Sequence, residues 1–156
     1  MIKNIKMMVY DFDGVMTDNR VLLAEDGKES VFVNRVDGLA VSAIRKLGIK
    51  QIIISTEKNK VVKARADKLK IGMIQSVNDK RKVLSNYLKL KSINPRNVVY
   101  IGNDLNDLPA MNLVGWPIAP SDACREVKSI AKIVLNKKGG QGVIREVFDI
   151  LENKRS

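Results

Sequence analysis

Histidine is absent from this 156-residue chain, and cysteine occurs only once. Without histidine the chain can have no Ser-His-Asp triad, no HExxH zinc site and no imidazole base. We therefore expect any acid or base catalysis to depend on carboxylates. The single cysteine, Cys124, excludes an internal disulfide and has no CxxC partner. We interpret it as a packing residue.

Long apolar runs are missing as well. No stretch approaches the ~20 apolar residues of a membrane span, and the first ten residues lack the apolar core and cleavage site of a signal peptide. The composition, 45% hydrophobic and 29% charged, is that of a soluble globular protein. We expect a cytoplasmic protein with no membrane partner. Its length predicts one domain over residues 1–152, with a frayed basic tail at 153–156.

The formal charge of +11 is not matched by a run of basic residues, and only 4% of the residues are aromatic. A basic surface can attract nucleic acid, anionic lipid or small anionic substrates. Lysines and arginines are scattered over every predicted helix, and few aromatics are available to stack on bases. We therefore expect a solvated lysine-rich surface that attracts small anions, and no nucleic-acid partner.

Short apolar runs alternate with longer amphipathic stretches along the chain. This alternation is typical of parallel strands joined by helices, and it predicts an α/β fold with a Rossmann-like, three-layer arrangement. The expected strands are 6–10, 51–54, 73–74, 98–101, 115–118 and 133–135. The expected helices are 39–47, 58–69, 79–90, 107–113, 122–129 and 142–151.

One segment breaks the alternation. Two β-rich runs, at residues 20–24 and 30–33, flank the sequence Glu25-Asp26-Gly27-Lys28. An Asp-Gly pair between such runs is typical of a β-hairpin. We predict a hairpin flap over residues 20–34, directly after the acidic turn that follows the first strand.

That acidic turn carries the first candidate site. The first strand is followed by Asp11-Phe12-Asp13-Gly14, with Thr17 shortly after. Alternation places Asp11 and Asp13 on one side and Phe12 toward the core, and Gly14 allows the chain to turn away. Two neighbouring carboxylates repel each other unless a cation or a proton offsets them. Such an oxygen site suits Mg²⁺, which also neutralises a bound phosphate.

Polar residues follow the other strands too, and ligands of open parallel sheets bind beyond the carboxyl ends of the strands. Ser55 and Thr56 come after the second strand, at the expected start of a helix whose free N–H groups favour phosphate. Lys80 begins the third helix and offers a fixed positive charge. The segment from Gly102 to Asp107 adds further oxygen ligands. Together these residues predict a metal and phosphate site.

Each motif has an ordinary explanation when taken alone. Asp-x-Asp-Gly and Asn-Asp-x-Asn-Asp are common in polar turns, and Ser-Thr before a helix is often a plain N-cap. Lys80 by itself would be a solvated helix residue. Their joint occurrence, each near a strand end and in chain order, favours phosphoryl chemistry.

The residues Asp11-x-Asp13, Ser55, Lys80 and the 102–107 segment resemble the four motifs of the haloacid dehalogenase superfamily. The resemblance covers essentially the whole chain. Within the superfamily the chain looks like the small phosphatases of sugar-acid biosynthesis, which have no cap domain. The stretches that carry this closer resemblance are residues 11–18, the predicted flap, Val36-Asp37-Gly38-Leu39, Tyr100-Ile101-Gly102 and the late segment 139–147, which begins Gly139-Gly140-Gln141-Gly142-Val143.

The resemblance implies a hydrolase of phosphate monoesters. Asp11 would attack phosphorus to give an aspartyl-phosphate, and Asp13 would protonate the leaving group and later activate water. It also implies a homo-oligomer, a tetramer, in which a neighbouring subunit covers each site. The implied phosphate-binding residues are Ser55, Thr56 and Lys80; the Mg²⁺ ligands are Asp11, Asp13, Asn103 and Asp104; the supporting residues are Gly14, Thr17 and Asp107.

Two departures from the family pattern bear on function. Asn103 stands where these phosphatases usually have an aspartate, so we expect weaker metal binding unless Asp104 or Asp107 compensates. Glu57, with Arg65 and Lys68, resembles the enzymes that act on KDN 9-phosphate, a nine-carbon sugar acid, in which matching residues reach a neighbour's site. The ordinary alternative for Arg65 and Lys68 is a charged helix surface.

The function expected from the sequence is therefore Mg²⁺-dependent hydrolysis of a nonulosonate 9-phosphate such as KDN 9-phosphate. Two alternatives stay open. The first is a phosphatase of 3-deoxy-manno-octulosonate 8-phosphate. The second is a non-catalytic oligomerisation module that keeps the fold, an alternative motivated by Asn103 and the small size.

Overall fold

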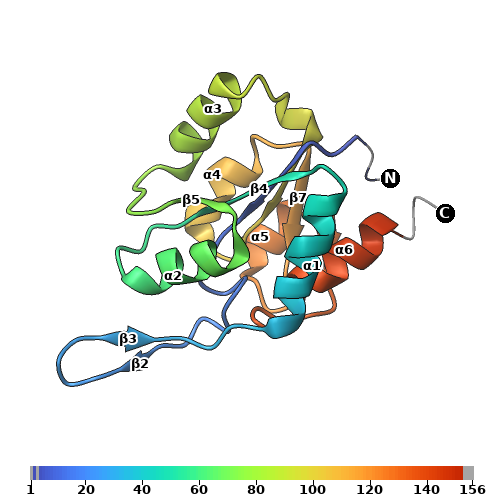
Figure 1. Cartoon of the computed structure of the whole chain (residues 1–156). Coiled ribbons are helices and arrows are strands. Elements are labelled where there is room, and N and C mark those ends of the chain that lie inside the picture. Colours follow the sequence, from blue (N-terminus) through green and yellow to red (C-terminus); the bar gives the residue numbers. More distant parts are fainter. Residues whose placement is uncertain (1, 3, 153–156) are drawn as a thin grey trace.

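A computed structural model describes residues 2 and 4–152 of the chain. Its core is one sheet of parallel strands in the order β5-β4-β1-β6-β7-β8 (Figure 1). The strands are β1 (Met7–Tyr10), β4 (Lys50–Ile54), β5 (Gly72–Ile74), β6 (Val98–Ile101), β7 (Trp116–Ala119) and β8 (Ile133–Val134). The predicted parallel α/β fold is confirmed, and β1 lies between β4 and β6 with its end at the middle of the sheet edge.

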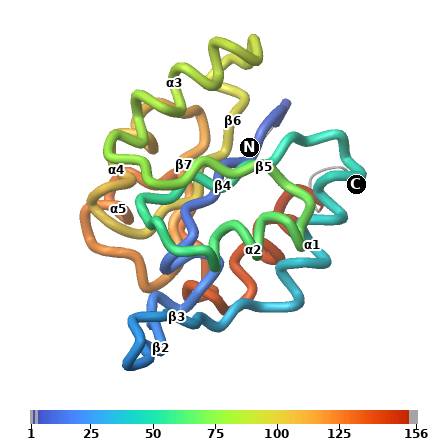
Figure 2. The backbone as a smooth tube through the Cα atoms, turned by 60° about the vertical axis from the view of Figure 1, so that its left-hand side comes forward, coloured from blue at the N-terminus to red at the C-terminus, as the bar shows by residue number. Residues whose placement is uncertain are grey.

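Helices cover both faces of the sheet, which gives three layers. Met8 and Tyr10 of β1 pack with α1, α2 and α6, whereas Met7 and Val9 pack with α3, α4 and α5. This division follows from the alternation of side chains along a strand. Figure 2 shows α4 and α5 on the side of the molecule opposite to α1. The helices are α1 (Arg35–Lys46), α2 (Lys60–Leu69), α3 (Lys80–Leu90), α4 (Leu108–Met111), α5 (Arg125–Ile130) and α6 (Val143–Glu152), and the 3₁₀ turns are η1 (Pro95–Asn97) and η2 (Leu105–Asp107).

The predicted flap is a β-hairpin that projects from the body of the molecule (Figure 1). Its strands β2 (Leu22–Leu23) and β3 (Glu29–Ser30) are antiparallel. The Gly27 amide donates to the Ala24 carbonyl over 2.9 Å and closes the turn. At the base of the flap, Thr17 and Val33 form an isolated antiparallel bridge. The flap is thus tied directly to the segment that follows Asp11.

Asparagine caps decide where two helices begin. The Asn34 side chain accepts from the Val36 amide, so α1 starts at Arg35, four residues before the expected start. The Asn59 side chain accepts from the Val61 amide, so α2 starts at Lys60. The prediction that Ser55 and Thr56 stand at the start of this helix is therefore wrong, because Asn59 is the N-cap and the two hydroxyls lie in the preceding loop.

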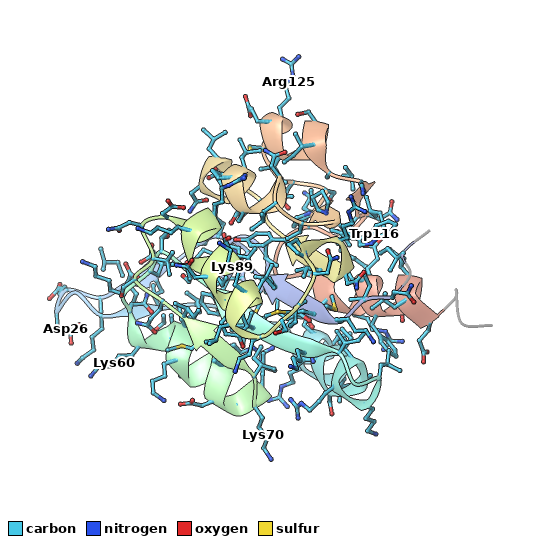
Figure 3. The ribbon with its side chains drawn as sticks, turned by 90° about the horizontal axis from the view of Figure 1, so that it is seen from above. Asp26, Lys60, Lys70, Lys89, Trp116 and Arg125 are labelled. Atoms are coloured by element: carbon cyan, nitrogen blue, oxygen red, sulfur yellow. The ribbon has the colours of Figure 1, made fainter. Side chains whose placement is uncertain are left out.

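The surface carries its positive charge in several places. Figure 3 shows the side chains of Lys60, Lys70 and Arg125 projecting from different sides of the molecule. No helix within the described part of the chain is long and apolar enough to cross a membrane. The basic tail at 153–156, for which we predicted fraying, lies outside the described residues.

Candidate active site

Side chains from three neighbouring strands meet at the carboxyl edge of the sheet. Asp11 directly follows β1, and its amide donates to the Ile101 carbonyl at the end of β6 over 2.9 Å. Asn103 comes two residues after β6, and Ser55 directly follows β4. Because β4, β1 and β6 are parallel neighbours, their ends bring these residues to one place.

A buried lysine links two buried carboxylates at this edge. Lys80 Nζ lies 2.8 Å from Asp11 Oδ1 and 2.7 Å from Asp107 Oδ1, and all three side chains are almost fully buried. Lys80 is the first residue of α3, behind the N-cap Asp79, as the sequence predicts. Asp107 Oδ2 also accepts a hydrogen bond from the main-chain N–H of Asn103 over 2.9 Å. Asp107 is thus occupied in positioning Lys80 and Asn103 and does not face the cavity as a metal ligand.

One ammonium group cannot neutralise both carboxylates of this triad. Burial and the charge of Asp107 raise the pKa of Asp11 from 3.8 to about 8, although Lys80 and the Phe12 amide act in the opposite direction. Burial alone would lower the pKa of Lys80, but the charges of Asp11 and Asp107 raise it. The site therefore holds excess negative charge whenever Asp11 is ionised, and a second cation would relieve it.

The Asp13 carbonyl oxygen, Asp11 Oδ2 and one end of the Asn103 side-chain amide converge on the cavity side of Asp11. One terminal atom of the Asn103 side-chain amide lies 2.9 Å from the Asp13 carbonyl oxygen and 3.2 Å from Asp11 Oδ2. With the amide nitrogen in that place, Asn103 donates hydrogen bonds to both oxygens. With the amide oxygen there, three acceptors face one another with no hydrogen between them. That second arrangement requires a cation.

With the Asn103 oxygen toward Asp11 and Asp13, the spacing of the three groups fits Mg²⁺. Octahedral Mg²⁺ with bonds of ~2.1 Å places neighbouring ligand oxygens about 3.0 Å apart, close to the two distances to the Asn103 amide. Residues 2 and 4–152 contain no cluster of three His, Cys, Asp or Glu side chains that could hold a metal. The donor set suits a hard cation all the same, because a main-chain carbonyl and an amide complete it.

Gly14 makes this close approach possible. Its φ of +77° is in the left-handed region, and a Cβ there would lie 2.0 Å from the other terminal atom of the Asn103 amide. The Gly14 amide donates to Thr17 Oγ1 over 3.3 Å, which closes the turn after Asp11. Gly14 and Thr17 therefore shape the loop on which the oxygen site depends.

Asp13 stands at the mouth of the site and is partly exposed. Its pKa is raised by burial and by the charges of Glu57 and Glu29, against the effect of Lys80 and a Thr17 hydrogen bond. A raised pKa keeps more of this carboxyl protonated near neutral pH. Asp13 can thus donate a proton to a departing group and take one from water afterwards.

The site opens into two adjoining spaces. A cavity of about 360 Å³ is lined by Asp11 and Asp13 together with Asn103, Asp104 and the 56–57 segment. A groove of about 710 Å³ adjoins it between residues 27–29 of the flap and residues 56–61, so Thr56 and Glu57 line both. A phosphate group fits the first space, and the remainder of a larger substrate fits the groove.

Ser55 is buried beside this cavity and does not line it. Its Oγ accepts from the Glu57 amide over 3.1 Å, which fixes the loop after β4. Asp104 lines the cavity, but its Oδ1 also accepts from the Leu105 amide over 2.7 Å and caps η2. Of the two hydroxyl residues after β4, Ser55 and Thr56, Thr56 is the one that lines the cavity.

Arg65 and Lys68 lie elsewhere in the same chain. They line a separate groove of about 580 Å³ together with Arg35, Arg45 and Lys70. Arg65 is only 9% exposed, and its Nη2 donates to the Asn34 carbonyl over 2.8 Å. The structure therefore does not bring these two residues to the Asp11 site of their own chain.

Two further residues contribute to the site. The buried Tyr100 hydroxyl donates to Asp107 Oδ1 over 2.8 Å and helps to orient the triad. Its side chain lies on the face of the sheet that α3 covers, the helix that begins at Lys80, so a polar group near the end of β6 on this face was a signal. Asn19 lines the cavity from the base of the flap, and no sequence signal marked it.

Comparison with known families matches residues 10–147 to the haloacid dehalogenase-like hydrolases. The chain belongs to this family. It is 34% identical over 150 residues to the 3-deoxy-D-manno-octulosonate 8-phosphate phosphatase KdsC of Salmonella typhi, an alignment that covers 96% of this chain and 80% of the relative. The resemblance to capless sugar-acid phosphatases is thereby confirmed.

Solved structures of family members agree. The octulosonate 8-phosphate phosphatase of Moraxella catarrhalis, in complex with magnesium, phosphate and KDO, superimposes with a TM-score of 0.94 at 31% identity, covering 97% of this chain and 88% of the other. A protein described only as a HAD-family hydrolase, from Streptomyces avermitilis, gives 0.91 at 46% identity, covering 94% and 84%. The haloacid dehalogenase fold thus extends over nearly the whole chain.

The raised pKa of Asp11 predicts how pH affects the metal-free protein. A carboxyl with a folded pKa of about 8 stabilises the fold below its unfolded value of 3.8, and this contribution is lost as pH rises through 8. A Mg²⁺ ion held at Asp11 would need the ionised carboxylate, so it would compete with the proton. We expect the Mg²⁺-induced rise in Tm to grow between about pH 6 and about pH 8. Thermal melts with and without Mg²⁺ across this range test it; a rise in Tm that shrinks with pH would contradict it.

Proposed function

We propose that this chain is a Mg²⁺-dependent phosphatase that hydrolyses the phosphate monoester of a sugar acid. The observation that carries the proposal is the position of Asp11, which lies between Lys80 on one side and the Asp13 carbonyl oxygen and Asn103 side-chain amide on the other. Lys80 is one positive centre, and Mg²⁺ held by the second group would be another, which suits attack of Asp11 on an anionic phosphate ester. Family membership and the magnesium-bound relative support the same conclusion.

In the first step the Asp11 carboxylate attacks phosphorus and the P–O bond to the sugar breaks. Asp13, held at the cavity mouth with a raised pKa, gives its proton to the leaving alkoxide. The products of this step are an aspartyl-phosphate and the free sugar acid. Lys80 stays beside Asp11 Oδ1 and offsets charge on the phosphoryl oxygens.

In the second step Asp13, now ionised, takes a proton from a water molecule that attacks the aspartyl-phosphate. Phosphate departs, and Asp11 returns as a carboxylate. Asp11, the Asp13 carbonyl and Asn103 would hold Mg²⁺, which would supply positive charge to the phosphoryl group in both steps. The buried Asp107 keeps Lys80 in place during both steps.

The nine-carbon substrate, a nonulosonate 9-phosphate such as KDN 9-phosphate, is supported by Glu57. This carboxylate lies where the small cavity meets the groove under the flap, so it can bind hydroxyls of the sugar chain. Lys58 and Lys60 line the same groove and can attract the sugar-acid carboxylate. The eight-carbon substrate, 3-deoxy-manno-octulosonate 8-phosphate, is supported equally by the names of the relatives.

Phosphate release from the two compounds, measured as kcat/KM with Mg²⁺, decides between them. The nine-carbon proposal predicts a higher value for KDN 9-phosphate, and Glu57→Gln should reduce that preference. A higher value for the octulosonate would assign the chain to that reaction. If neither compound nor any other phosphorylated sugar is hydrolysed and Mg²⁺ does not raise Tm, the non-catalytic module is the better description.

We further propose that the flap mediates assembly into a homo-oligomer, a tetramer. Leu22 is 70% exposed and Phe32 79% exposed, which is costly for an isolated chain. The basic groove with Arg65 and Lys68 would then face the acidic cavity of a neighbouring copy. Sedimentation equilibrium should give the mass of an oligomer for the wild type and a lower mass for Phe32→Asp. A monomeric wild type would overturn the proposal.

Asn103→Asp should increase the affinity for Mg²⁺. The variant adds a negative charge beside Asp11 Oδ2 and the Asp13 carbonyl oxygen, and tighter binding of about tenfold is expected, or ~1.4 kcal/mol. The metal-free variant should also be less stable than the wild type, because a carboxylate cannot donate to Asp13 and Asp11 as the amide can. Calorimetric titration with Mg²⁺ measures the affinity, and equal affinities would show that residue 103 does not ligate the ion.

A further inference from the structure

Two glycines in the loop before α6 lie directly against the segment that follows Asp11. A Cβ on Gly139 would be 2.2 Å from the carbonyl oxygen of Gly14, and one on Gly140 would be 2.6 Å from the Asp18 amide nitrogen. No side chain fits at such distances from backbone atoms. The two segments are more than a hundred positions apart in the sequence, yet they touch through bare backbone. We call residues 139–140 the brace.

Hydrogen bonds from three parts of the chain hold the brace in this position. The Gly140 amide donates to the Val15 carbonyl over 3.0 Å, and the Gly139 amide donates to Asp122 Oδ1 over 2.9 Å. Asn34 Nδ2 donates to the Gly140 carbonyl over 3.3 Å. In Figure 1 the orange-red loop before α6 passes beside the blue segment at the base of the flap. The brace is therefore held by Asp122 and Asn34 as well as by its contact with the loop that follows Asp11.

The contact matters because of what Gly14 connects. The peptide before Gly14 carries the Asp13 carbonyl oxygen, which lies 2.9 Å from the Asn103 amide in the oxygen site. The peptide after Gly14 carries the carbonyl oxygen that the brace meets. A Cβ at position 139 would push the Gly14 carbonyl away, and since Gly14 alone joins the two peptides, the part of that push not absorbed by rotation about the Gly14 Cα–C bond reaches the Asp13 carbonyl.

We propose that Gly139 and Asp122 are positioning residues for the metal site. Gly139 keeps the Gly14 carbonyl, and through it the Asp13 carbonyl, in the orientation that faces Asn103, and Asp122 fixes Gly139. The inference deepens the proposed function and rests on it, because the site that the brace orients is the proposed Mg²⁺ site. Neither residue touches substrate or metal.

Gly139→Ala tests the close approach. Residues that orient metal ligands from outside typically contribute 10- to 100-fold to metal affinity, and we expect about that loss in Mg²⁺ affinity here. Gly142→Ala is the control: it has a φ of +95°, so alanine is strained, but no atom lies within 4 Å of its Cβ position. Both variants should lower Tm without Mg²⁺, and only Gly139→Ala should weaken the Mg²⁺ response.

A second pair of variants tests the anchor without added bulk. Asp122 is exposed, and Asp122→Ala and Asp122→Asn remove the same negative charge. Only the asparagine keeps an oxygen that accepts from the Gly139 amide. We expect Asp122→Ala to bind Mg²⁺ several-fold more weakly and Asp122→Asn to recover most of that loss. This pair keeps the test decisive even if Gly139→Ala fails to fold.

The measurement is Mg²⁺ affinity by calorimetric titration, with Tm as a second reading. If the wild type binds Mg²⁺ and the Mg²⁺ affinities of Asp122→Ala and Asp122→Asn are equal, the inference is overturned and the proposed function is left intact. Equal affinities of Gly139→Ala and Gly142→Ala do the same. A wild type that neither binds Mg²⁺ nor releases phosphate overturns the proposed function itself, and the inference with it.

Discussion

Replacing Asp11 by Asn is expected to reduce kcat for phosphate release by at least ~10⁴-fold. The amide cannot attack phosphorus, and no histidine is available to take over as nucleophile. The fold should survive, because Asn resembles the protonated carboxyl that burial already favours at this position. The assay is steady-state phosphate release, and Tm without Mg²⁺ reports on folding.

Asp67→Asn is a matched control for this variant. Asp67 lies on α2 and is exposed, and its carboxylate pairs with Lys63 of the same helix. We expect Asp67→Asn to turn over substrate at the wild-type rate, whereas no variant at Asp11 should do so. Turnover by Asp11→Asn within tenfold of the wild type would mean that another group attacks phosphorus.

Replacing Lys80 by Met is expected to lower the free energy of unfolding by about 3–5 kcal/mol, the usual cost of removing one partner from a buried ion pair. The lysine is shared by Asp11 and Asp107, so its loss leaves two buried carboxylates facing each other. Phosphatase activity should fall to background. Urea denaturation without Mg²⁺ measures the stability.

Two further variants separate stability from catalysis. Lys82→Met, on the exposed side of the same helix, should change the free energy of unfolding by less than about 0.5 kcal/mol. The double variant Lys80→Met/Asp107→Asn should regain stability relative to Lys80→Met, because one buried charge is removed, but should stay inactive. If Lys80→Met unfolds at the same urea concentration as the wild type, the ion pairs contribute nothing to stability.

Much of this site could be predicted from the order of polar residues along the chain. Parallel strands end at one edge of the sheet, so the residues that follow the apolar runs are expected to lie close together. In the structure Lys80 and Asn103 both lie within hydrogen-bonding distance of the Asp11 carboxylate. The flap followed from an Asp-Gly pair between β-rich runs. These are local rules, and the sequence is sufficient for them.

Other features depend on competition or on distant contacts. Asn59 competes with Ser55 as the helix cap, and composition alone does not say which one prevails. Asp107 looked like a possible metal ligand until the structure showed that it faces Lys80 and Tyr100. The contact of Gly139 with Gly14 joins opposite ends of the chain, and no spacing rule predicts it.

Chemical trapping of the phosphorylated protein tests the role of Asp11 most directly. The protein is mixed with excess KDN 9-phosphate and Mg²⁺, quenched in acid within one turnover, and digested for mass spectrometry, with the octulosonate 8-phosphate in a parallel sample. The mechanism predicts one added phosphoryl group, labile to hydroxylamine, on the peptide that contains Asp11. A phosphoryl group on any other residue, or substrate turnover with no trapped phosphoryl group at all, would contradict it.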